Sequence, residues 1–296
     1  VPFTITPVLV DHSAYDAYSL LIEAEGRRVF YSGDFRGHGR KSSLHEKLIT
    51  TPPSSIHALL MEGTSIGRPE CTEFRYPTEE MLESQMTEAF MTTTGLAMVH
   101  TSAQNIDRVV TMFRSARKSG RELVIDLYAA AILEATRNAR LPQSDWEGVR
   151  LFIPHSQRLQ VKKNGWFELL DRHKTRRIYG ETLAADPGRY CLLFRPLHQL
   201  DLDRSGCLEG AHYIYSQWMG YWDGGSYDTT RQWLNDNGIP FQAIHTSGHA
   251  DPQTLKRFVK ALAPERLVPI HSFHPEHFPD LYHTVEPHGD GEWWDV

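Results

Sequence analysis

The stretch VDHSAYDAYSLLIEAEGRRVFYSGDFRG, residues 10–37, places a histidine and an aspartate after strand-like segments. Two apolar runs, 18–24 and 28–32, flank a Glu-Gly-Arg turn, and this pattern predicts a β-hairpin. His12 follows the first apolar segment of the chain, and Asp34 follows the hairpin. Side chains at the carboxyl ends of strands are candidates for chemistry, because loops leave an open sheet together at that edge.

The composition describes a soluble globular chain. With 296 residues, 40% of them hydrophobic, the chain is long enough for one large domain or two ordinary ones. No apolar run is long enough to cross a membrane, and no secretory signal pattern opens the chain. The three cysteines, Cys71, Cys191 and Cys207, are widely spaced and form no Cys-x-x-Cys pattern. This usage favours a reducing, cytoplasmic compartment over a disulfide framework or a thiolate metal site.

Strand and helix patterns alternate beyond the hairpin. Residues 57–63 and 95–100 are typical of buried strands, while 78–92 and 105–120 have helical signals. A further strand is expected at 121–127 and a helix at 129–139, whereas 141–190 is polar and is expected to be irregular. From 211 the alternation resumes, with helices expected at 227–237 and 252–262. The order predicts a parallel α/β unit over about residues 85–200.

Five chemically capable side chains lie at or just beyond the ends of predicted strands: His12, Asp34, Glu62, His249 and His271. Two imidazoles and a carboxylate suit Zn²⁺ better than Mg²⁺. An aspartate that bridges two metals suits hydrolysis of a phosphodiester by activated water.

Each of these residues also has an ordinary structural explanation. An aspartate after Ser-Gly is commonly a turn residue, and Glu62 with the Gly and Thr that follow it can cap a turn. His274 and His277 can be surface residues of a proline-broken loop. The seven Lys and Arg residues between Arg158 and Arg177 are, by default, a solvated loop. The coincidence of five such residues at five strand ends favours a site.

Short motifs around these residues occur in the order of a known family. They are Asp11-His12-Ser13, YSGDFR (31–36), LLMEGTS (59–65), Ser-Gly-His-Ala (247–250) and VPIHS (268–272). The chain thereby resembles the metallo-β-lactamase-fold hydrolases of the β-CASP nuclease group, typified by ribonuclease J, over nearly its whole length. TSAQNIDR (101–108) is similar to the start of the inserted β-CASP domain.

The resemblance implies an α/β fold, namely part of a metallo-β-lactamase αββα sandwich with an inserted parallel α/β domain. Residues 1–85 would be the middle part of the metallo-β-lactamase domain, 86–205 the β-CASP-like insertion, and 206–296 the return to the first domain.

The resemblance also implies roles for the candidate residues. His12 would bind a first zinc, Asp34 would bridge both metals, and His271 would bind the second. His249, oriented by Glu62, would hold the scissile phosphate and help to protonate the leaving oxygen. Ser102, Gln104 and Asn105 would offer hydrogen bonds to the substrate backbone, although capping of the following helix explains them equally well.

One family motif is missing. The His-x-His-x-Asp-His string, which supplies further metal ligands from the N-terminal half, occurs nowhere in the chain, and the first residue is Val1 rather than Met. We therefore expect that the N-terminal half of the family pattern is absent, either truncated or unrecorded. The complete protein would hold two zinc ions, whereas this chain would hold an incomplete site.

The expected function is a metal-dependent phosphodiester hydrolase, an RNA-processing or RNA-degrading nuclease that uses a zinc-activated hydroxide. The long insertion between Glu62 and His249 favours this function, and single-stranded RNA is the expected partner. A hydrolase of a small ester or phosphodiester, or an inactive partner subunit, are the alternatives, which the net charge of −6 weakly favours. A homodimer is compatible with the resemblance, and the choice between internal and terminal cleavage stays open.

Overall fold

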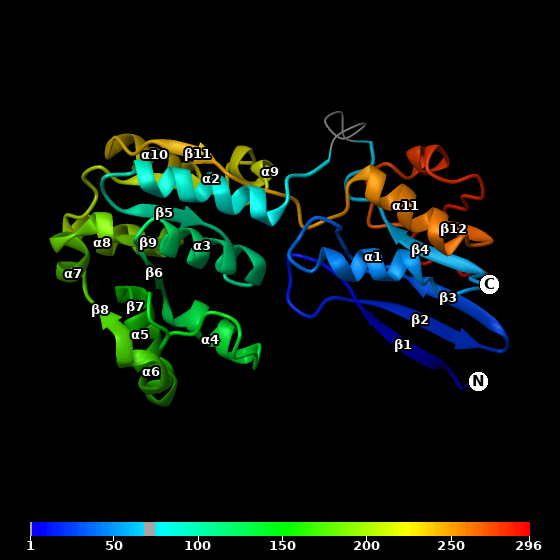
Figure 1. Cartoon of the computed structure of the whole chain (residues 1–296), viewed down its shortest axis with the longest axis horizontal. Helices are drawn as coiled ribbons and strands as arrows, with labels where there is room; N and C mark the ends of the chain where they lie inside the picture. Colours follow the sequence, from blue (N-terminus) through cyan, green and yellow to red (C-terminus); the bar gives the residue numbers. More distant parts are fainter. Residues whose placement is uncertain (1, 68–74) are drawn as a thin grey trace. The chain divides into compact units, whose positions relative to one another are not determined.

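The computed structural model of the chain describes residues 2–67 and 75–296. It divides into two compact units, which are Val1–Thr78 with Ser247–Val296 (unit 1) and Glu79–Thr246 (unit 2) (Figure 1). The predicted α/β class is confirmed. Within the described residues, no helix has both the length and the apolar character needed to span a membrane.

Unit 1 is built on a sheet of five strands in the order β1-β2-β3-β4-β12. The strands are β1 (Thr4–Leu9), β2 (Tyr18–Ala24), β3 (Arg27–Tyr31), β4 (Ala58–Glu62) and β12 (Arg266–Ile270). The predicted hairpin is β2–β3, which pairs antiparallel, and β1 pairs antiparallel with β2. In contrast, β3, β4 and β12 run parallel to one another, so their carboxyl ends lie at the same edge of the sheet.

The core of unit 1 joins this sheet to helices α1 (Ser42–Thr50) and α11 (Pro252–Leu262). Phe258 of α11 packs on Phe35, with ring centroids 4.5 Å apart, and on Phe30 of β3 at 6.0 Å. The start of α11 follows from its sequence, because the Asp251 side chain accepts a hydrogen bond from the amide of Thr254 at 2.7 Å. A short 3₁₀ segment, η5 (Pro275–Asp280), adds buried Phe278 to this core.

Unit 2 contains a sheet of seven strands in the order β11-β10-β5-β9-β6-β7-β8, and all its pairs are parallel. The strands are β5 (Ala97–His100), β6 (Glu122–Ile125), β7 (Val149–Phe152), β8 (Arg177–Ile178), β9 (Tyr190–Phe194), β10 (His212–Tyr215) and β11 (Phe241–Ala243). The helices are α2 (Glu79–Thr92), α3 (Ile106–Lys118), α4 (Leu127–Ala135), α5 (His155–Asn164), α6 (Phe167–His173), α7 (Gly180–Ala185), α8 (Gln199–Ser205), α9 (Met219–Asp223) and α10 (Asp228–Asp236). Three 3₁₀ turns complete the unit: η2 (Lys174–Arg176), η3 (Pro187–Arg189) and η4 (Pro196–His198).

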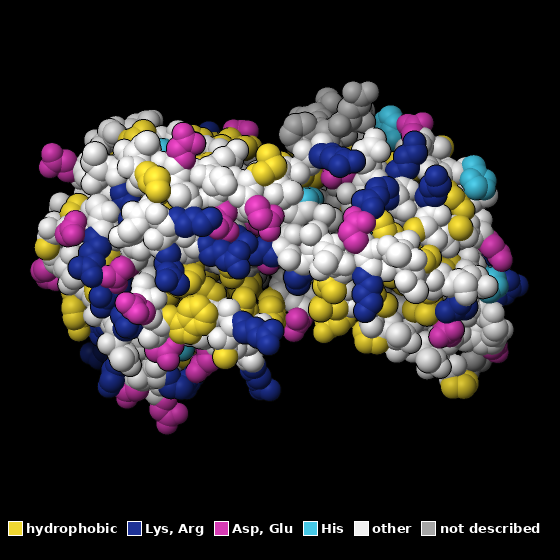
Figure 2. Space-filling model, viewed as in Figure 1, with side chains coloured by type: hydrophobic (Ala, Val, Ile, Leu, Met, Phe, Trp, Pro, Cys, Tyr) yellow, Lys and Arg dark blue, Asp and Glu magenta, His cyan; other side chains and the backbone are white. Residues whose placement is uncertain are grey.

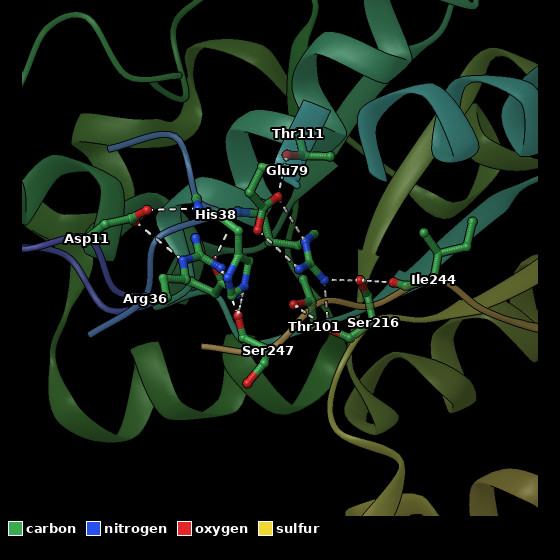
Figure 3. Close-up of polar contacts among 12 residues, drawn as sticks. Asp11, Arg36, His38, Glu79, Thr101, Thr111, Ser216, Ile244 and Ser247 are labelled. Carbon is green, nitrogen blue, oxygen red and sulfur yellow. Dashed lines mark hydrogen bonds and ion pairs between the residues drawn. The ribbon is translucent and has the colours of Figure 1, made fainter. Parts of the chain in front are cut away.

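A buried ion pair ties the first turn of α2 to α3. Arg108 donates to Glu79 at 3.1 Å, and both side chains are fully buried. The same carboxylate accepts a hydrogen bond from Thr111 at 2.8 Å, and Arg108 also donates to the carbonyl of Ser216 at 3.1 Å (Figure 3). The guanidinium therefore links two helices to the segment that follows β10.

Two expectations differ from the structure. Residues 141–190 are not irregular, because they contain β7, α5, α6, β8 and α7. These strands are too short to produce a periodic pattern, and they are defined by pairing with β6 and with each other. The expected return to the first domain at 206 also lies inside unit 2, because β10 and β11 extend the parallel sheet and the chain re-enters unit 1 at Ser247.

The cysteines in the described part of the chain are free. Cys191 and Cys207 are both buried in unit 2, and burial raises the pKa of the Cys207 thiol to about 11. Such thiols are packing groups rather than metal ligands. Cys71 lies outside the described residues.

Candidate metal centre

Parallel strands of unit 1 deliver three candidate residues to one sheet edge. Asp34 lies three residues beyond β3, Glu62 ends β4, and His271 follows directly after β12. His249, from the loop before α11, joins them. One potential ligand atom from each of the four residues lies within 4.8 Å of all the others. The structure thus brings together side chains that are far apart in the sequence.

The Asp34–His271 pair has the spacing of two ligands of one cation. Asp34 Oδ1 lies 2.9 Å from Nδ1 of His271, and both side chains are more than a third exposed. Two atoms that each lie about 2.1 Å from a tetrahedral zinc are roughly 3.4 Å apart, so a separation slightly larger than the observed 2.9 Å would admit this metal between the two side chains. His271 also has a positive φ of 46°, a strained conformation for a residue with a Cβ atom.

Glu62 is a fully buried carboxylate that holds His249. Its Oε2 lies 3.1 Å from Nδ1 of His249, and its Oε1 accepts the backbone amide of Phe35 at 3.0 Å. Burial raises the pKa of Glu62, but the hydrogen bond and charge of His249 and the amide of Phe35 outweigh it and leave the pKa below its usual value. The carboxylate is therefore ionised and fixes the orientation of the imidazole.

His12 lies beside this pair. Its Nδ1 donates to the backbone carbonyl of Gly248 at 2.6 Å, and its ring centroid is 5.4 Å from that of His249. Because Nδ1 carries the proton in this hydrogen bond, Nε2 is left with the lone pair that a metal needs. Burial lowers the pKa of His12, and the neighbouring charge of His249 lowers it further, so the neutral ligand form is favoured.

Thr64 was not singled out from the sequence, although it contacts both His249 and His271. Its Oγ1 lies 3.2 Å from Nδ1 of His249 and 3.1 Å from Nδ1 of His271. The hydroxyl follows Glu62 within the Glu-Gly-Thr motif, which is the only signal of its position in the sequence.

Arg36, also missed from the sequence, braces the loops that carry the site. It forms a completely buried ion pair with Asp11 and donates to the carbonyl of Ser247 at 3.1 Å (Figure 3). Asp11 accepts the amide of Gly39 at 2.8 Å, and His38 donates to the same Ser247 carbonyl at 2.9 Å. These contacts connect the loops after β1 and β3 with the loop that contains His249.

The predicted substrate-binding residues belong to unit 2. Asn105 is the N-cap of α3, since its side chain accepts the amide of Arg108 at 3.1 Å. Ser102 Oγ accepts the amide of Gln104 at 3.2 Å, and Gln104 donates to the hydroxyl of Tyr128 at 2.9 Å. The capping alternative therefore applies to Asn105, whereas Ser102 and Gln104 are exposed.

The basic cluster of residues 158–177 is partly neutralised by nearby carboxylates. Arg172 makes two hydrogen bonds with Glu134, at 3.0 and 3.1 Å. Arg158 pairs with Asp201 at 3.2 Å, and Lys174 pairs with Asp171 at 2.7 Å. The cluster thus offers less free positive charge than its sequence indicates.

A separate exposed group, His274, Glu276 and His277, also has ligand atoms within 4.8 Å of one another.

Comparisons with known proteins agree with this geometry. Residues 241–274, which include His249 and His271, match the family model RMMBL, described as a Zn-dependent metallo-hydrolase RNA specificity domain. Among solved structures, the chain is similar to a protein of unknown function from Enterococcus faecalis V583, with 24% identity and a TM-score of 0.77. That match covers 98% of this chain and 63% of the other, so the chain spans less than two thirds of that protein. The search of curated proteins finds no match. The family match concerns residues 241–274 alone, and the structural match, at 24% identity, shows that the fold is shared.

Proposed function

We propose that this chain forms part of a zinc-dependent phosphodiester hydrolase that cleaves RNA. The observation that carries the proposal is the convergence of Asp34, Glu62, His249 and His271 at one sheet edge. The match of residues 241–274 to an RNA specificity domain supports RNA as the substrate class.

In this proposal, His12, Asp34 and His271 hold the metal. A bound zinc would supply a Lewis acid and lower the pKa of water toward neutrality. Asp34 lies 2.9 Å from His271 and its charge acts on His12, so it is the residue that would serve both ions. His12 contributes Nε2, because its Nδ1 is engaged by the Gly248 carbonyl.

His249 and Glu62 form the proposed acid–base pair. Glu62 holds His249 through Nδ1, so that Nε2 is the atom that can bind the scissile phosphate and donate a proton to the leaving oxygen. The ionised carboxylate holds the imidazole in one orientation, as a general acid requires.

The donor set of this chain is small for two metals. A catalytic zinc usually has three protein ligands, whereas three residues here would be divided between two ions. The proposal therefore concerns the complete protein, with additional ligands supplied by segments outside this chain. The chain by itself is expected to bind zinc weakly.

The test is cleavage of a fluorescent single-stranded oligoribonucleotide by the complete protein, with zinc content measured on the same samples. Asp34→Asn and His271→Ala should lower both metal content and cleavage. Glu62→Gln and His249→Ala should retain metal and lose cleavage by about 10²- to 10⁴-fold, the usual contribution of a general acid. Unchanged metal content and cleavage in Asp34→Asn and His271→Ala would refute the proposal.

The small donor set favours one alternative, an inactive partner subunit that binds RNA without cleaving it. Bis(p-nitrophenyl) phosphate distinguishes this alternative, since a working metal centre should hydrolyse this small diester even if RNA is the wrong polymer. A protein that binds RNA but hydrolyses neither substrate would support the partner-subunit function.

A further inference from the structure

The carboxyl edge of the unit 2 sheet carries exposed aromatic side chains next to polar groups. Adjacent strands follow the order β10-β5-β9-β6. One residue of interest follows each strand within four positions of its end. These residues are Trp218 after β10, Gln104 after β5, Arg195 after β9 and Tyr128 after β6. All strands in this part of the sheet are parallel, so these four residues, of which Tyr128 lies in the first turn of α4, belong to segments that leave the same edge.

Tyr128 is an exposed ring held in one orientation from two sides. The guanidinium of Arg195 lies over the ring, 4.9 Å from its centroid, and Gln104 donates to the phenol oxygen at 2.9 Å. The side chain is nevertheless 39% exposed. A single exposed aromatic residue needs no explanation, but one fixed by two polar side chains from neighbouring strand ends does.

The Arg195 guanidinium is itself anchored. Its Nε donates to Asp126 at 2.8 Å, and Asp126 is fully buried. Asp126 also caps α4, because its other oxygen accepts the amide of Ala129 at 2.8 Å. The positive charge of Arg195 is thus neutralised by the buried carboxylate, and its remaining role at the surface is to support the Tyr128 ring.

Trp218 provides a second fixed ring on the same edge. Its six-membered ring lies against Gly220, where an added Cβ would come within 2.3–2.5 Å of three ring carbons. The Trp218 side chain is 47% exposed, and the edge of Tyr221, which is 55% exposed, packs against it with centroids 5.2 Å apart. The glycine at position 220 is therefore required for the ring to lie in this position.

The chemistry of this edge suits bases rather than phosphates. Flat exposed rings stack on nucleobases without sequence preference, and an arginine behind a ring strengthens the stack. Three strand spacings of about 4.8 Å separate β6 from β10, so the ends of these two strands are roughly 14 Å apart along the sheet edge. On the face shown in Figure 2, hydrophobic side chains gather beside Lys and Arg over α3 and α4.

We propose that the carboxyl edge of the unit 2 sheet binds bases of single-stranded RNA by stacking on Tyr128 and Trp218. The choice of RNA rests on the proposed function; the stacking surface rests on the geometry of unit 2 alone. Arg195 and Gln104 are positioning residues, since they act through the orientation of Tyr128.

The test is the affinity of the whole chain for a fluorescent oligoribonucleotide, measured by anisotropy in the presence of a chelator so that no cleavage occurs. Tyr128→Ala and Trp218→Ala should each weaken binding by about 5- to 150-fold, the loss of one stacked base. Tyr128→Phe keeps the ring and its contact with Arg195 but loses the hydrogen bond from Gln104, so its affinity should lie between those of the unchanged chain and Tyr128→Ala. Trp166→Ala is the matched control, since Trp166 is equally exposed at 47% but lies between α5 and α6.

An oligonucleotide with abasic sites separates stacking from a general loss of structure. The unchanged chain and Tyr128→Ala should bind this ligand with equally low affinity, because neither protein can stack on a missing base. Because stacking releases no counterions, the variants should also keep the salt dependence of the unchanged chain. Thermal denaturation establishes that each variant is folded, and Trp218→Ala provides an independent test if Tyr128→Ala is not.

Two outcomes would overturn the inference. In the first, the chain binds the oligonucleotide but Tyr128→Ala and Trp218→Ala bind equally well. In the second, the unchanged chain does not bind at all. Neither outcome decides the proposed function, because hydrolysis of bis(p-nitrophenyl) phosphate by the complete protein reports on the metal centre independently of this surface.

Discussion

Replacement of Arg36 by methionine should destabilise unit 1 strongly. The guanidinium and the carboxylate of Asp11 are both fully buried, with Nε and Oδ1 3.3 Å apart. The substitution removes the positive charge but leaves the carboxylate in the interior. Loss of one partner from such a pair costs about 3–5 kcal/mol, because the buried carboxylate no longer has the guanidinium beside it.

Urea denaturation followed by circular dichroism measures this effect. With a slope of about 2 kcal/mol per molar urea, the expected loss lowers the transition midpoint by about 1.5–2.5 M. Asp11→Asn in the Arg36→Met background should restore part of the stability, because the amide oxygen can still accept the Gly39 amide and no buried charge remains.

Arg257→Met is the matched control for Arg36→Met. Arg257 pairs with Glu46 at 2.7 Å, but both side chains are about half exposed. Exposed pairs contribute about 0–1 kcal/mol, so the midpoint should fall by no more than about 0.5 M. The reasoning is refuted if Arg36→Met shifts the midpoint no further than Arg257→Met does, or if removing the Asp11 charge restores nothing.

Three other changes have defined outcomes. Burial lowers the pKa of both His100 and His198 to about 4, so the unfolded chain, with a pKa near 6.5, binds more protons between these values. The free energy of unfolding should therefore lose nothing through these histidines above about pH 6.5, and below that pH it should fall by about 1.4 kcal/mol per pH unit for each histidine. Urea titrations that show no loss by about pH 5 would contradict this. Gly33→Ala should destabilise unit 1 by roughly 1–2 kcal/mol and should lower the zinc affinity measured in a competition assay. The reason is that φ of Gly33 is +55° and the new Cβ would lie 2.9 Å from the Tyr18 carbonyl oxygen. Unchanged stability and zinc affinity would contradict this prediction. Asn105→Ala should cost about 1 kcal/mol in thermal or urea denaturation, while Asn105→Ser should retain the cap; equal losses in both variants would contradict the capping role.

The strands that carry the candidate metal ligands could be predicted from the sequence because their signals are local. Two apolar runs around a turn define the β2–β3 hairpin, and a compact apolar run defines β4. Asp34 and Glu62 lie at the ends of these segments, where their positions follow directly from strand boundaries. The prediction that they lie near His271 depended on parallel pairing of β3, β4 and β12, which the structure contains.

Other features depend on tertiary contacts that leave no periodic pattern. β8 has two residues and β7 has four, so their strand character comes from hydrogen bonds to neighbours rather than from propensity. Arg36 looks like a surface arginine in the sequence, yet it is fully buried against Asp11. Thr64 contacts two histidines that lie about two hundred residues further along the chain, and only the folded structure reveals this role.

The two halves of the proposed centre are held by different physical means. Asp34, Glu62 and His271 depend on adjacent parallel strands, whose hydrogen bonds fix their spacing. His12 and His249 instead depend on the loop at 247–250, which Arg36 and the Gly248 carbonyl hold in place. Disturbing the buried Arg36 ion pair should therefore displace the acid–base histidine and one metal ligand together, while the Asp34–His271 pair stays in position. Loss of cleavage with partial retention of metal is the result this division leads us to expect for Arg36 variants that remain folded.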